Sequence, residues 1–571
     1  MNKKEVAEIL EQIGTLLELK NENPFKIRAY YNAARAIDAF SGDLETLVKE
    51  NKLRELKGVG SGLSEKITEL VTMGRLKYYE ALKKSLPSSL LDMLNIPGVG
   101  PKKAKKLYDE LGIQSIGELE YACKENRLLD LEGFGEKSQQ KILEGIRFIR
   151  SHEEHHLYPE ALEAAEKILE ALKKAKSAKQ MSIGGSLRRK KEIIRDIDFV
   201  VAAKDPDAVM ERFTSLPDIK TVQQKGETKA SLLFKSGIQA DLRVVSDKEF
   251  PYALHHFTGS KEHNIAMRAR AQRMGYKMNE YGLFKGSRLI PCKDEEDIFK
   301  KLGLVYIPPE MREDTGEIEA AEKGKLPNLV QAKDIRGIFH VHSIYSDGAA
   351  TLEENVKEAI QLGYEYLGIS DHSQSARYAH GVEEERLKKQ QKEIDALNGK
   401  YKGKLVILKG SEVDILPDGS LDYSEKILKT FDFVIASVHT RFTMNEEEMT
   451  RRVIRAIQNP YTTMLGHPTG RLLLSREPYA IDLKQVIDTA KKFNKIIELN
   501  ANPHRFDLDW RVCKLAKEKG VLLSINPDAH HSGSLSDTDF GVGIAQKGWL
   551  SPQDIFNTLS LPKILTRLKN K

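Results

Sequence analysis

The spacing of hydrophobic residues changes along the chain, and this change most limits the folds that the chain can adopt. In the N-terminal part, apolar residues recur at helical spacing, as at Val6, Leu10 and Ile13, and glycines divide the pattern into short helices. From about Lys179, short strand-like runs take over. In the C-terminal part such runs alternate with helical stretches, which is typical of a parallel α/β domain. A chain of 571 residues is also too long for one hydrophobic core, so several domains are expected.

Composition excludes several classes of protein. Cys123, Cys292 and Cys513 lie far apart, which disfavours a disulfide framework or a cysteine zinc site and fits a reducing cytosol. The chain opens into a charged amphipathic pattern without the apolar core of a signal peptide, and no apolar run approaches the length of about 20 residues that spans a membrane. We therefore expect a soluble, cytoplasmic protein. The net charge of +6 is small for this length and neither requires nor excludes nucleic acid.

A glycine-rich pattern occurs three times in the N-terminal part, beginning at Leu56, Ile96 and Leu131. Each copy continues with Gly-apolar-Gly and the start of a helix. The glycines permit a tight turn whose backbone N–H groups can approach a phosphate, and the lysines that follow add charge without reading bases. One copy alone would fit an ordinary glycine-capped turn equally well, but three copies resemble helix-hairpin-helix motifs, which implies sequence-independent DNA binding. The expected DNA contacts are Gly58, Gly60, Gly98, Gly100, Lys102, Gly133 and Gly135.

Three aspartates follow in the strand-rich part. Asp196 and Asp198 lie one residue apart on an expected strand, so both project to the same face, and Asp241 lies on a neighbouring strand. Three carboxylates so placed can hold two hard cations such as Mg²⁺, as two-metal phosphoryl transfer requires. The preceding Gly-Gly-Ser turn, with Arg188 and Arg189, offers donors to a triphosphate. An Asp-x-Asp at a surface strand edge is the alternative, and the Gly-Gly-Ser and Arg-Arg segments argue against it.

This constellation resembles the nucleotidyl-transferase motif of family X DNA polymerases, and the likeness continues through residues 256–282. The resemblance implies catalytic roles for Asp196, Asp198 and Asp241, and nucleotide binding by Gly185, Ser186, Arg189, Phe257, Gly259, Asn264 and Arg268. Phe257 and Gly259 are expected at the sugar, and Asn264 and Arg268 at the base and template side. Eukaryotic members usually carry Tyr-Phe where this chain has His-Phe, so selection between deoxy- and ribonucleotides stays open.

A further likeness concerns Lys66, which matches a lysine that forms a Schiff base during deoxyribose-phosphate excision in some family members. Lys26 and Tyr30 match supporting positions. A Schiff-base lysine must be neutral part of the time, so burial or basic neighbours must lower its pKa. An exposed lysine that binds phosphate is the alternative, and the sequence does not decide between the two.

Histidines are concentrated in the C-terminal part, where nine of the fifteen lie between His340 and His531. Several stand at the ends of expected strands, where an α/β barrel gathers its active-site residues. A single histidine at such a place is more often structural, but the pair His340 and His342 puts two imidazoles on one side of a strand. Imidazole with carboxylate suits Zn²⁺, Mn²⁺ or Fe. So many of these side chains exceed the needs of one ion and predict a cluster suited to phosphoester hydrolysis.

These motifs resemble the PHP (polymerase and histidinol phosphatase) domain over essentially residues 333–571. The ligands that the resemblance implies are His340, His342, Asp347, His372, Glu412, His439, His467, Asp528 and His530. One departure is Ile338, where Asp is common in the family, and it could alter the support of a ligand. Outside the pattern lie His380, His504 and His531, of which His380, like Arg505, could reach a phosphate.

In this order, the motifs match the architecture of bacterial and archaeal family X polymerases. The resemblance implies gap filling in base-excision repair, on gapped or nicked DNA with deoxynucleoside triphosphates, by a monomer associated with the nucleoid. It implies Mg²⁺ or Mn²⁺ at the carboxylates, and two or three Mn²⁺, Zn²⁺ or Fe ions in a PHP domain that acts as a 3′–5′ exonuclease and abasic-site endonuclease. The alternatives are a phosphoesterase whose polymerase half only delivers DNA, a non-enzymatic scaffold for DNA ends, and a small-molecule phosphatase.

The expected fold is therefore multidomain, with α+β and α/β parts. The predicted domains are a helical, lyase-like DNA-binding domain (1–82), fingers with two helix-hairpin-helix repeats (83–150), a nucleotidyl-transferase palm with a mixed sheet (151–246), an α/β thumb (247–315), a linker (316–333) and a distorted (β/α)7-type PHP barrel (334–571). The linker is expected because its residues are charged and poor in aromatics, and include glycine and proline.

Overall fold

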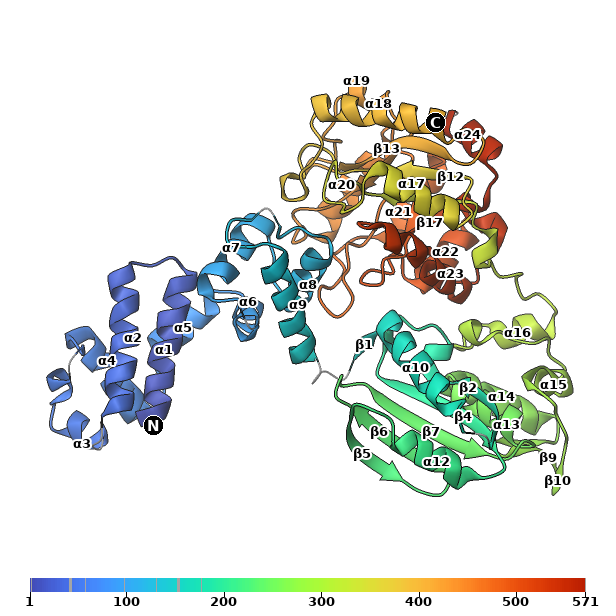
Figure 1. The fold of residues 1–571 in the computed structure, drawn as a ribbon, viewed down its shortest axis with the longest axis horizontal. Helices are drawn as coiled ribbons and strands as arrows, with labels where there is room; N and C mark the ends of the chain where they lie inside the picture. Colours follow the sequence, from blue (N-terminus) through green and yellow to red (C-terminus); the bar gives the residue numbers. More distant parts are fainter. Residues whose placement is uncertain are drawn as a thin grey trace. The chain divides into compact units, whose positions relative to one another are not determined.

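The chain, seen in a computed structural model, comprises two compact units, Met1–Arg147 and Phe148–Lys571 (Figure 1). The residues outside the described part are Asn2, 41–43, Lys57, Pro97, Asp130, 151–154, Lys176 and 570–571. The predicted start of the palm, at residue 151, falls among these. Within the described residues, no helix is both long enough and apolar enough to cross a membrane.

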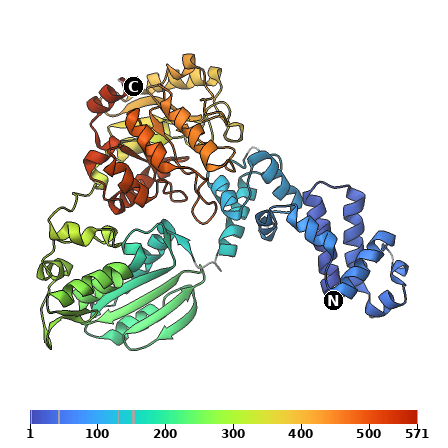
Figure 2. The same ribbon diagram turned by 180° about the vertical axis from the view of Figure 1, so that it is seen from behind.

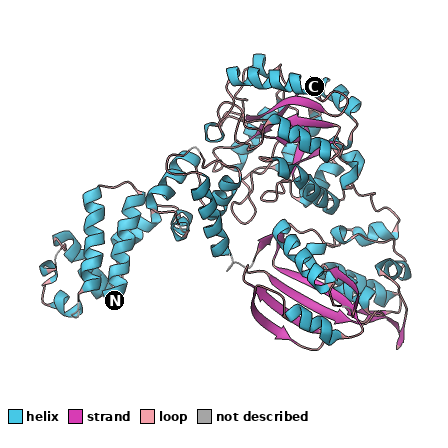
Figure 3. Cartoon of the chain, in the orientation of Figure 1, coloured by secondary structure: helices cyan, strands magenta, loops and turns pink. Residues whose placement is uncertain are grey.

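The N-terminal unit is built from helices, and its described residues form no strand (Figure 3). Leu10, Ile13 and Leu17 recur on one face of α1, and this face packs in a single apolar core with residues of α2 such as Ile37. The helices are α1 (Lys3–Leu19), α2 (Pro24–Ala39), α3 (Leu44–Lys49), α4 (Ser61–Met73), α5 (Lys77–Lys84), α6 (Ser88–Asp92), α7 (Pro101–Leu111), α8 (Ile116–Lys124) and α9 (Glu136–Arg150).

A five-stranded mixed sheet, which we call the palm sheet, has the strand order β2–β4–β7–β6–β5 (Figures 1 and 2). Its central strands β4 and β7 are parallel, and the other neighbours are antiparallel. The strands are β2 (Ala178–Ile183), β4 (Asp196–Ala203), β5 (Ile219–Lys225), β6 (Lys229–Phe234) and β7 (Gln239–Val245). The adjoining elements are β1 (His156–Leu157), α10 (Tyr158–Leu172), α11 (Gly185–Arg188), β3 (Ile193–Ile194), α12 (Pro206–Thr214) and α13 (Phe250–Thr258).

The two faces of the palm sheet carry different side chains because successive residues of a strand point in opposite directions. Ile197 and Phe199 of β4 pack against α10 and α12. Val200 packs on the other face, against α13. By the same alternation, Asp196 and Asp198 lie on the face that α13 covers.

A smaller subdomain, α13 to α16, follows the palm sheet and contains the antiparallel sheet β10–β9–β8. Its further elements are α14 (Lys261–Arg273), β8 (Lys277–Asn279), β9 (Gly282–Lys285), β10 (Arg288–Leu289), α15 (Glu295–Lys301) and α16 (Glu317–Glu322). Residues 316–333, expected to be a linker, include α16, whose Ile318 and Ala321 belong to the apolar core of this subdomain. The charged composition predicted a linker, but Glu317 is buried against His263, with 2.7 Å between Oε1 and Nδ1.

Seven parallel strands in sequence order form a nearly closed barrel, as the α/β alternation predicted. A parallel bridge between Val341 and Ala529 joins the first strand to the segment after the last. The strands are β11 (Gly337–Val341), β12 (Tyr366–Ile369), β13 (Val406–Asp414), β14 (Phe433–Ser437), β15 (Met464–Leu465), β16 (Ile496–Asn500) and β17 (Leu523–Asn526). The helices are α17 (Leu352–Gln361), α18 (Glu384–Lys400), α19 (Glu425–Leu428), α20 (Glu446–Gln458), α21 (Leu483–Lys492), α22 (Trp510–Glu518), α23 (Thr538–Lys547) and α24 (Leu561–Lys569).

The barrel and the residues that precede it share contacts within the C-terminal unit. Trp549, just after α23, packs against the apolar core of the α13–α16 subdomain. Lys514 of α22 donates a hydrogen bond from Nζ to the backbone oxygen of Thr315, at 2.7 Å. Lys190 donates from Nζ to Oε1 of Gln546, at 2.8 Å. The barrel is therefore joined to both the palm sheet and the α13–α16 subdomain.

Candidate functional site

The three predicted catalytic aspartates lie together on adjacent parallel strands. Asp198 of β4 and Asp241 of β7 are partners in the strand register. Ser231 and Gln239 donate hydrogen bonds to separate oxygens of Asp241, the second at 2.9 Å. Burial, together with the charges of Asp196 and Asp241, raises the pKa of Asp198 to about 7. Three carboxylates that repel one another in this way fit divalent cations, whose charge would offset the repulsion.

A glycine turn brings the preceding chain against Asp198. Gly184 donates a backbone hydrogen bond to the carbonyl oxygen of Asp198 at 2.8 Å. Gly185 has a φ of +62°, and a Cβ built there would lie 2.1 Å from Oδ2 of Asp198. A side chain at Gly185 would therefore be strained and would displace the carboxylate. The glycine is required both by the turn and by the close approach.

A cavity of about 390 Å³ lies beside these aspartates. All seven residues predicted to bind nucleotide line it, together with Asp196 and Asp198. Asn264 is fixed in the wall, because its Nδ2 donates to the backbone oxygen of His256 at 2.7 Å. Further lining residues are His256, Thr258 and Lys261, for which the sequence predicted no nucleotide contact. Their position in or directly after the His-Phe-Thr-Gly-Ser run was the available signal.

The two adjacent arginines take different places. Arg189 lines the cavity, pairs with Glu313 (Nε to Oε1, 3.0 Å) and donates to the backbone oxygen of Thr258. Arg188, which the sequence also assigned to the triphosphate, instead forms an ion pair with Glu295 and donates to Oγ1 of Thr258 at 2.5 Å. Arg188 thus supports the wall of the cavity, and Arg189 faces its interior.

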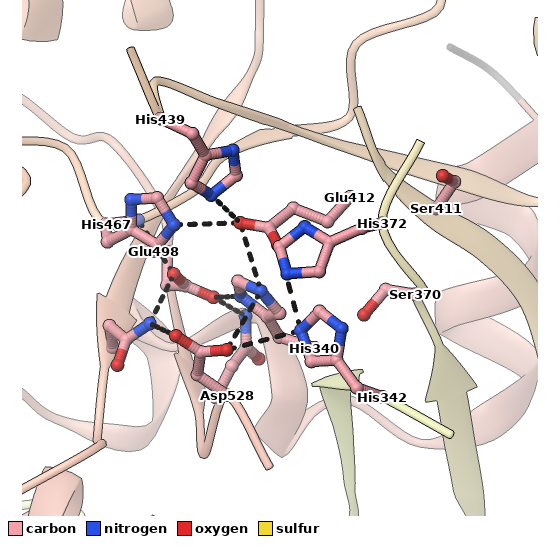
Figure 4. A network of polar contacts seen from close by, with 12 residues as sticks. His340, His342, Ser370, His372, Ser411, Glu412, His439, His467, Glu498 and Asp528 are labelled. Atoms are coloured by element: carbon pink, nitrogen blue, oxygen red, sulfur yellow. Dashed lines mark hydrogen bonds and ion pairs between the residues drawn. The ribbon is translucent and has the colours of Figure 1, made fainter. Parts of the chain in front are cut away.

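The nine predicted ligands of the barrel gather at the carboxyl ends of its strands. Figure 4 shows those around Glu412, without Asp347 and His530. One oxygen of Glu412, Oε1, lies 3.3, 3.2 and 2.8 Å from Nε2 of His340, His439 and His467. The other, Oε2, lies 3.0 Å from Nδ1 of His372. A single carboxylate therefore stands among imidazoles from several strands.

Two further carboxylates extend this cluster. Oδ1 of Asp528 lies 3.3 Å from Nε2 of both His340 and His342. Oδ1 of Asp347 lies 3.3 Å from Nε2 of His530. The nitrogen and oxygen atoms form overlapping groups whose members lie within 4.8 Å of one another, and this donor set fits more than one transition-metal cation. Outside these groups, as found among the described residues, lie His380, His504 and His531.

Three residues of the cluster have a left-handed backbone. The φ angles of His340, His467 and Asp528 are +60°, +23° and +51°. This region is uncommon for residues with a side chain and costs on the order of 1–3 kcal/mol for each. Such a cost persists at functional sites, where the surrounding structure holds the side chain in place. The strain therefore supports a functional role for the cluster.

Protonation in the cluster follows from burial and from the neighbouring charges. Burial alone would raise the pKa of Glu412, but the adjacent histidines hold it well below its usual range. Burial lowers the pKa of His467 to about 4, and Arg505 adds to the effect. The pKa of His439 is raised to about 9 despite its burial, because Glu412 and Asp414 face it. Neutral imidazole, the form that binds metal, is thus the ordinary state of His467 at neutral pH.

The carboxylates behind the ligands were missed in the sequence. Nδ1 of His340 contacts Glu498, and Nδ1 of His439 contacts Asp414, each at 2.7 Å. A histidine ligand is oriented through its second nitrogen. Glu498 therefore supplies support that Ile338, which packs in an apolar core, cannot give. The available signal was an acidic residue, Glu498, between the apolar residues Ile497 and Leu499 of strand β16.

The three glycine turns of the N-terminal unit precede helices, as predicted. The first glycines of the copies, at φ of +98°, +90° and +86°, are Gly58, Gly98 and Gly133. The second glycines directly precede the helices α4, α7 and α9, and are Gly60, Gly100 and Gly135. Except at Gly58, a Cβ added to any of them would meet no atom of the described residues within 4 Å, apart from its chain neighbours. The backbone of these turns is thus open to a ligand, and Lys102 is exposed beside one of them.

The three residues of the predicted lyase site gather around Tyr78. Nζ of Lys66 lies 5.2 Å, and Nζ of Lys26 5.8 Å, from the centre of the Tyr78 ring. Tyr30 stacks on the same ring, with 6.4 Å between centroids. Lys66 also donates to the backbone oxygen of Gly62 at 3.2 Å. Tyr78 was not identified from the sequence.

Models of known families match four parts of the chain. They are a helix-hairpin-helix domain (residues 1–76), a SAM-like helix-hairpin-helix tandem (90–147), a DNA polymerase beta thumb (253–313) and a PHP domain (339–502). The thumb model covers most of the α13–α16 subdomain, and the PHP model covers the barrel from β11 to β16.

One relative matches from end to end. The chain is 39% identical to the DNA polymerase/3′-5′ exonuclease PolX of Bacillus subtilis (strain 168), and the match covers 100% of both chains. The chain belongs to the family X DNA polymerases that carry a PHP domain. Shorter relatives of this family X chain match its parts. A probable phosphatase of Thermoanaerobacter sp. (strain X514) is 32% identical over 41% of the chain and 94% of that protein. A repair DNA polymerase X of African swine fever virus (isolate Pig/Kenya/KEN-50/1950) is 34% identical over 24% of the chain and 82% of the viral protein.

Membership of family X confirms the expected fold class, with helix-hairpin-helix domains, a thumb, a mixed sheet and a PHP barrel. A polymerase part joined to a PHP domain implies that the family X chain binds DNA and deoxynucleoside triphosphates and uses divalent cations. The end-to-end match to a polymerase also favours polymerase activity over the alternative in which the polymerase half only delivers DNA.

Proposed function

We propose that this family X chain fills gaps in DNA during base-excision repair and trims 3′ ends with its PHP domain. The observation that carries the first part is the placement of Asp196, Asp198 and Asp241 on one face of the palm sheet, beside a cavity lined by Arg189. The full-length relative is named as a polymerase and a 3′–5′ exonuclease, which supports both parts. The proposed substrates are gapped or nicked duplex DNA and deoxynucleoside triphosphates.

In the proposed polymerase site, the three aspartates hold Mg²⁺ or Mn²⁺. Bound there, such cations would neutralise charge on the triphosphate and lower the pKa of the primer hydroxyl. Arg189 binds triphosphate oxygens through charge-assisted hydrogen bonds, and Gly185 and Ser186 add backbone and hydroxyl donors. The sugar, base and template sides of the cavity are assigned to Phe257, Gly259, Asn264 and Arg268.

Primer extension by the full chain on a gapped duplex tests this proposal. With Mg²⁺ and all four deoxynucleoside triphosphates, we expect the primer to be extended across the gap. The alternative is a phosphoesterase whose polymerase half only delivers DNA. Equally poor extension by the wild type and by Asp198→Ala would favour that alternative.

The substitution Gly185→Ala is expected to slow primer extension by about 100-fold, because a misplacement of about 1 Å at a reacting centre has an effect of this size. The new Cβ, 2.1 Å from Oδ2 of Asp198, would push this carboxylate away from its partners. Single-turnover incorporation measures the loss. The control is Gly226→Ala in the turn between β5 and β6, where the nearest atom would lie 3.5 Å from the added Cβ. Normal extension by Gly185→Ala would contradict the assigned geometry.

For the PHP domain we propose 3′–5′ exonuclease activity and cleavage at abasic sites, with two or three Mn²⁺, Zn²⁺ or Fe ions held by the nine clustered ligands. Bound there, the cations would neutralise the phosphate and activate water. Arg505, whose Nε lies 3.4 Å from Asp528, adds a positive charge at the edge of the cluster. Comparing hydrolysis of a DNA 3′ end with that of p-nitrophenyl phosphate separates this activity from that of a small-molecule phosphatase. We expect the DNA end to be hydrolysed faster.

We also propose that Lys66 forms a Schiff base with an abasic deoxyribose phosphate. Its support is the placement of Lys66, Lys26 and Tyr30 around Tyr78. Borohydride should then trap a covalent adduct with incised abasic DNA in the wild type, and Lys66→Ala should abolish it. Lys77→Ala, which alters an exposed lysine of the next helix, should keep the adduct. A full signal in Lys66→Ala would leave Lys66 as a phosphate-binding residue.

We propose the functional divisions 1–82, 83–150, 151–246, 247–315 and 334–571 for the lyase-like domain, fingers, palm, thumb and PHP domain. We further propose that the protein acts as a monomer on the DNA of the nucleoid. Sedimentation of the protein with and without gapped DNA tests the oligomeric state.

A further inference from the structure

A buried lysine of the barrel reaches the polymerase half. Lys547, the last residue of α23, is 0% exposed. Its Nζ forms an ion pair with Oε1 of Glu313 and donates to the backbone oxygen of Arg189 at 3.2 Å. Burying an ammonium group is costly unless it is paired and hydrogen-bonded, and both conditions are met here. The contact joins a helix of the PHP domain to Arg189, which lines the nucleotide cavity, and to Glu313, the partner of Arg189.

The same carboxylate oxygen binds Arg189. Nε of Arg189 lies 3.0 Å from Oε1 of Glu313, and both side chains are nearly buried. The guanidinium also donates to the backbone oxygen of Thr258, which lines the cavity with Arg189. Arg189 is therefore held from behind by Glu313, while it faces the cavity. A change at Glu313 would act directly on the guanidinium proposed to bind triphosphate.

Lys547 and Arg189 share the negative charge of Glu313. Burial alone would raise the pKa of Glu313, but Lys547 and Arg189 hold it below its usual range, so the carboxylate is charged. The only other basic group that the ion pairs place at Glu313, among the described residues, is Lys191 at 4.0 Å. Without Lys547, the negative charge would fall mainly on Arg189 and reduce the attraction of its guanidinium for phosphate.

We propose that Lys547 is a positioning residue of the polymerase reaction, which sets the orientation and available charge of Arg189 through Glu313. The PHP domain then forms part of the structure behind the nucleotide cavity, independently of its own hydrolytic chemistry. This inference rests on the proposed polymerase function, because it assigns a partner to Arg189 in that site.

The test replaces Lys547 by methionine in the full chain and measures single-nucleotide gap filling. We expect Lys547→Met to raise KM for the deoxynucleoside triphosphate about tenfold, the effect of losing one charge-assisted contact, with kcat changed less than twofold. The matched control is Lys514→Met, which removes a second lysine of the same interface, one that donates to Thr315 and does not contact Glu313. This control should keep the wild-type KM. Hydrolysis of DNA 3′ ends and thermal unfolding report whether each variant is folded.

Rescue separates positioning from a general weakening of the interface. Adding Glu313→Gln to Lys547→Met removes the negative charge that competes with phosphate for Arg189, while the amide oxygen can still accept from Nε of the guanidinium, so KM should return to within about threefold of the wild type. An unchanged KM in Lys547→Met, an equal rise in Lys514→Met, or no rescue in the double variant would each overturn the proposal. If Lys547→Met does not fold, Glu313→Gln alone gives the test, and we expect it to lower KM severalfold; no decrease would overturn the proposal.

Nucleotide binding separates a failure of this inference from a failure of the proposed function. Titration of the full chain with Mg²⁺ and a fluorescent deoxynucleoside triphosphate, without DNA, measures Kd even if no primer is extended. Wild type without extension would contradict the proposed function. A Kd that is the same for Lys547→Met and wild type would contradict the role of Lys547, whatever the extension assay shows.

Discussion

Asp198→Asn is expected to slow primer extension on a gapped duplex by about 10³-fold. Asparagine keeps the shape of the side chain but removes the charge with which Asp198, Asp196 and Asp241 hold cations. Cations at such a site contribute several kcal/mol of transition-state stabilisation, and each 1.36 kcal/mol corresponds to about a factor of ten in rate. Folding should not suffer, because the substitution removes the repulsion that helps to raise the pKa of Asp198 to about 7.

The measurement is single-turnover incorporation, with degradation of the 3′ end followed in the same samples. The Asp198→Asn variant should degrade the 3′ end at the wild-type rate, because the residues proposed to carry out degradation lie in the barrel. Asp207→Asn changes an exposed aspartate of α12 and serves as the matched control, with extension at the wild-type rate. Extension by Asp198→Asn within tenfold of the wild type would place the chemistry elsewhere.

The second large effect is expected for Glu412→Gln, which should reduce 3′-end degradation by about 10³-fold and leave extension unchanged. Both oxygens of Glu412 face imidazole nitrogens, from His340, His439 and His467 on one side and His372 on the other. A neutral amide would weaken the binding of every cation that these groups share. Metal ions contribute several kcal/mol to the stabilisation of the transition state in such hydrolysis. One substitution should therefore affect the whole cluster.

Degradation of a 3′-labelled duplex and the metal content of the purified protein test this expectation. We expect less than the wild-type amount of bound metal in Glu412→Gln. Glu425→Gln, on the exposed surface of α19, is the control and should keep both metal and activity. Full degradation by Glu412→Gln with unchanged metal content would mean that the cluster is not the hydrolytic site.

Much of the polymerase site could be predicted because it depends on short-range geometry. The alternation of side chains along one strand placed Asp196 and Asp198 on one face. Gly185 indicated a tight turn, in which a larger residue would be strained and would clash with Asp198. The sequence also placed Asp241 on a neighbouring strand, and in the structure Asp241 is the register partner of Asp198. For the barrel, ligands at successive strand ends converge by topology alone.

The parts that escaped prediction depend on contacts between distant segments. Glu317 was expected in a linker, but its buried carboxylate contacts Nδ1 of His263 and accepts hydrogen bonds from the backbone N–H groups of Asp314 and Thr315, and composition does not reveal such contacts. Glu498 lies between apolar residues of β16, and only the folded barrel shows that it supports His340. Arg188 and Arg189 are neighbours with the same chemistry. Their division between Glu295 and Glu313 is decided by the α13–α16 subdomain, which supplies both glutamates.

Because Lys547 of α23 is buried against Glu313 and Arg189, we expect a truncation that removes the barrel to disturb the polymerase half as well. A chain cut after residue 333 would lose Trp549 from the thumb core and Lys547 from Glu313. Inactivity of such a fragment would reflect a damaged cavity wall, and it would say nothing about hydrolysis. These contacts also bear on descent. A relative could lose hydrolysis through a change of a single ligand such as Glu412. Selection for synthesis would still retain the barrel, because its contacts support Arg189.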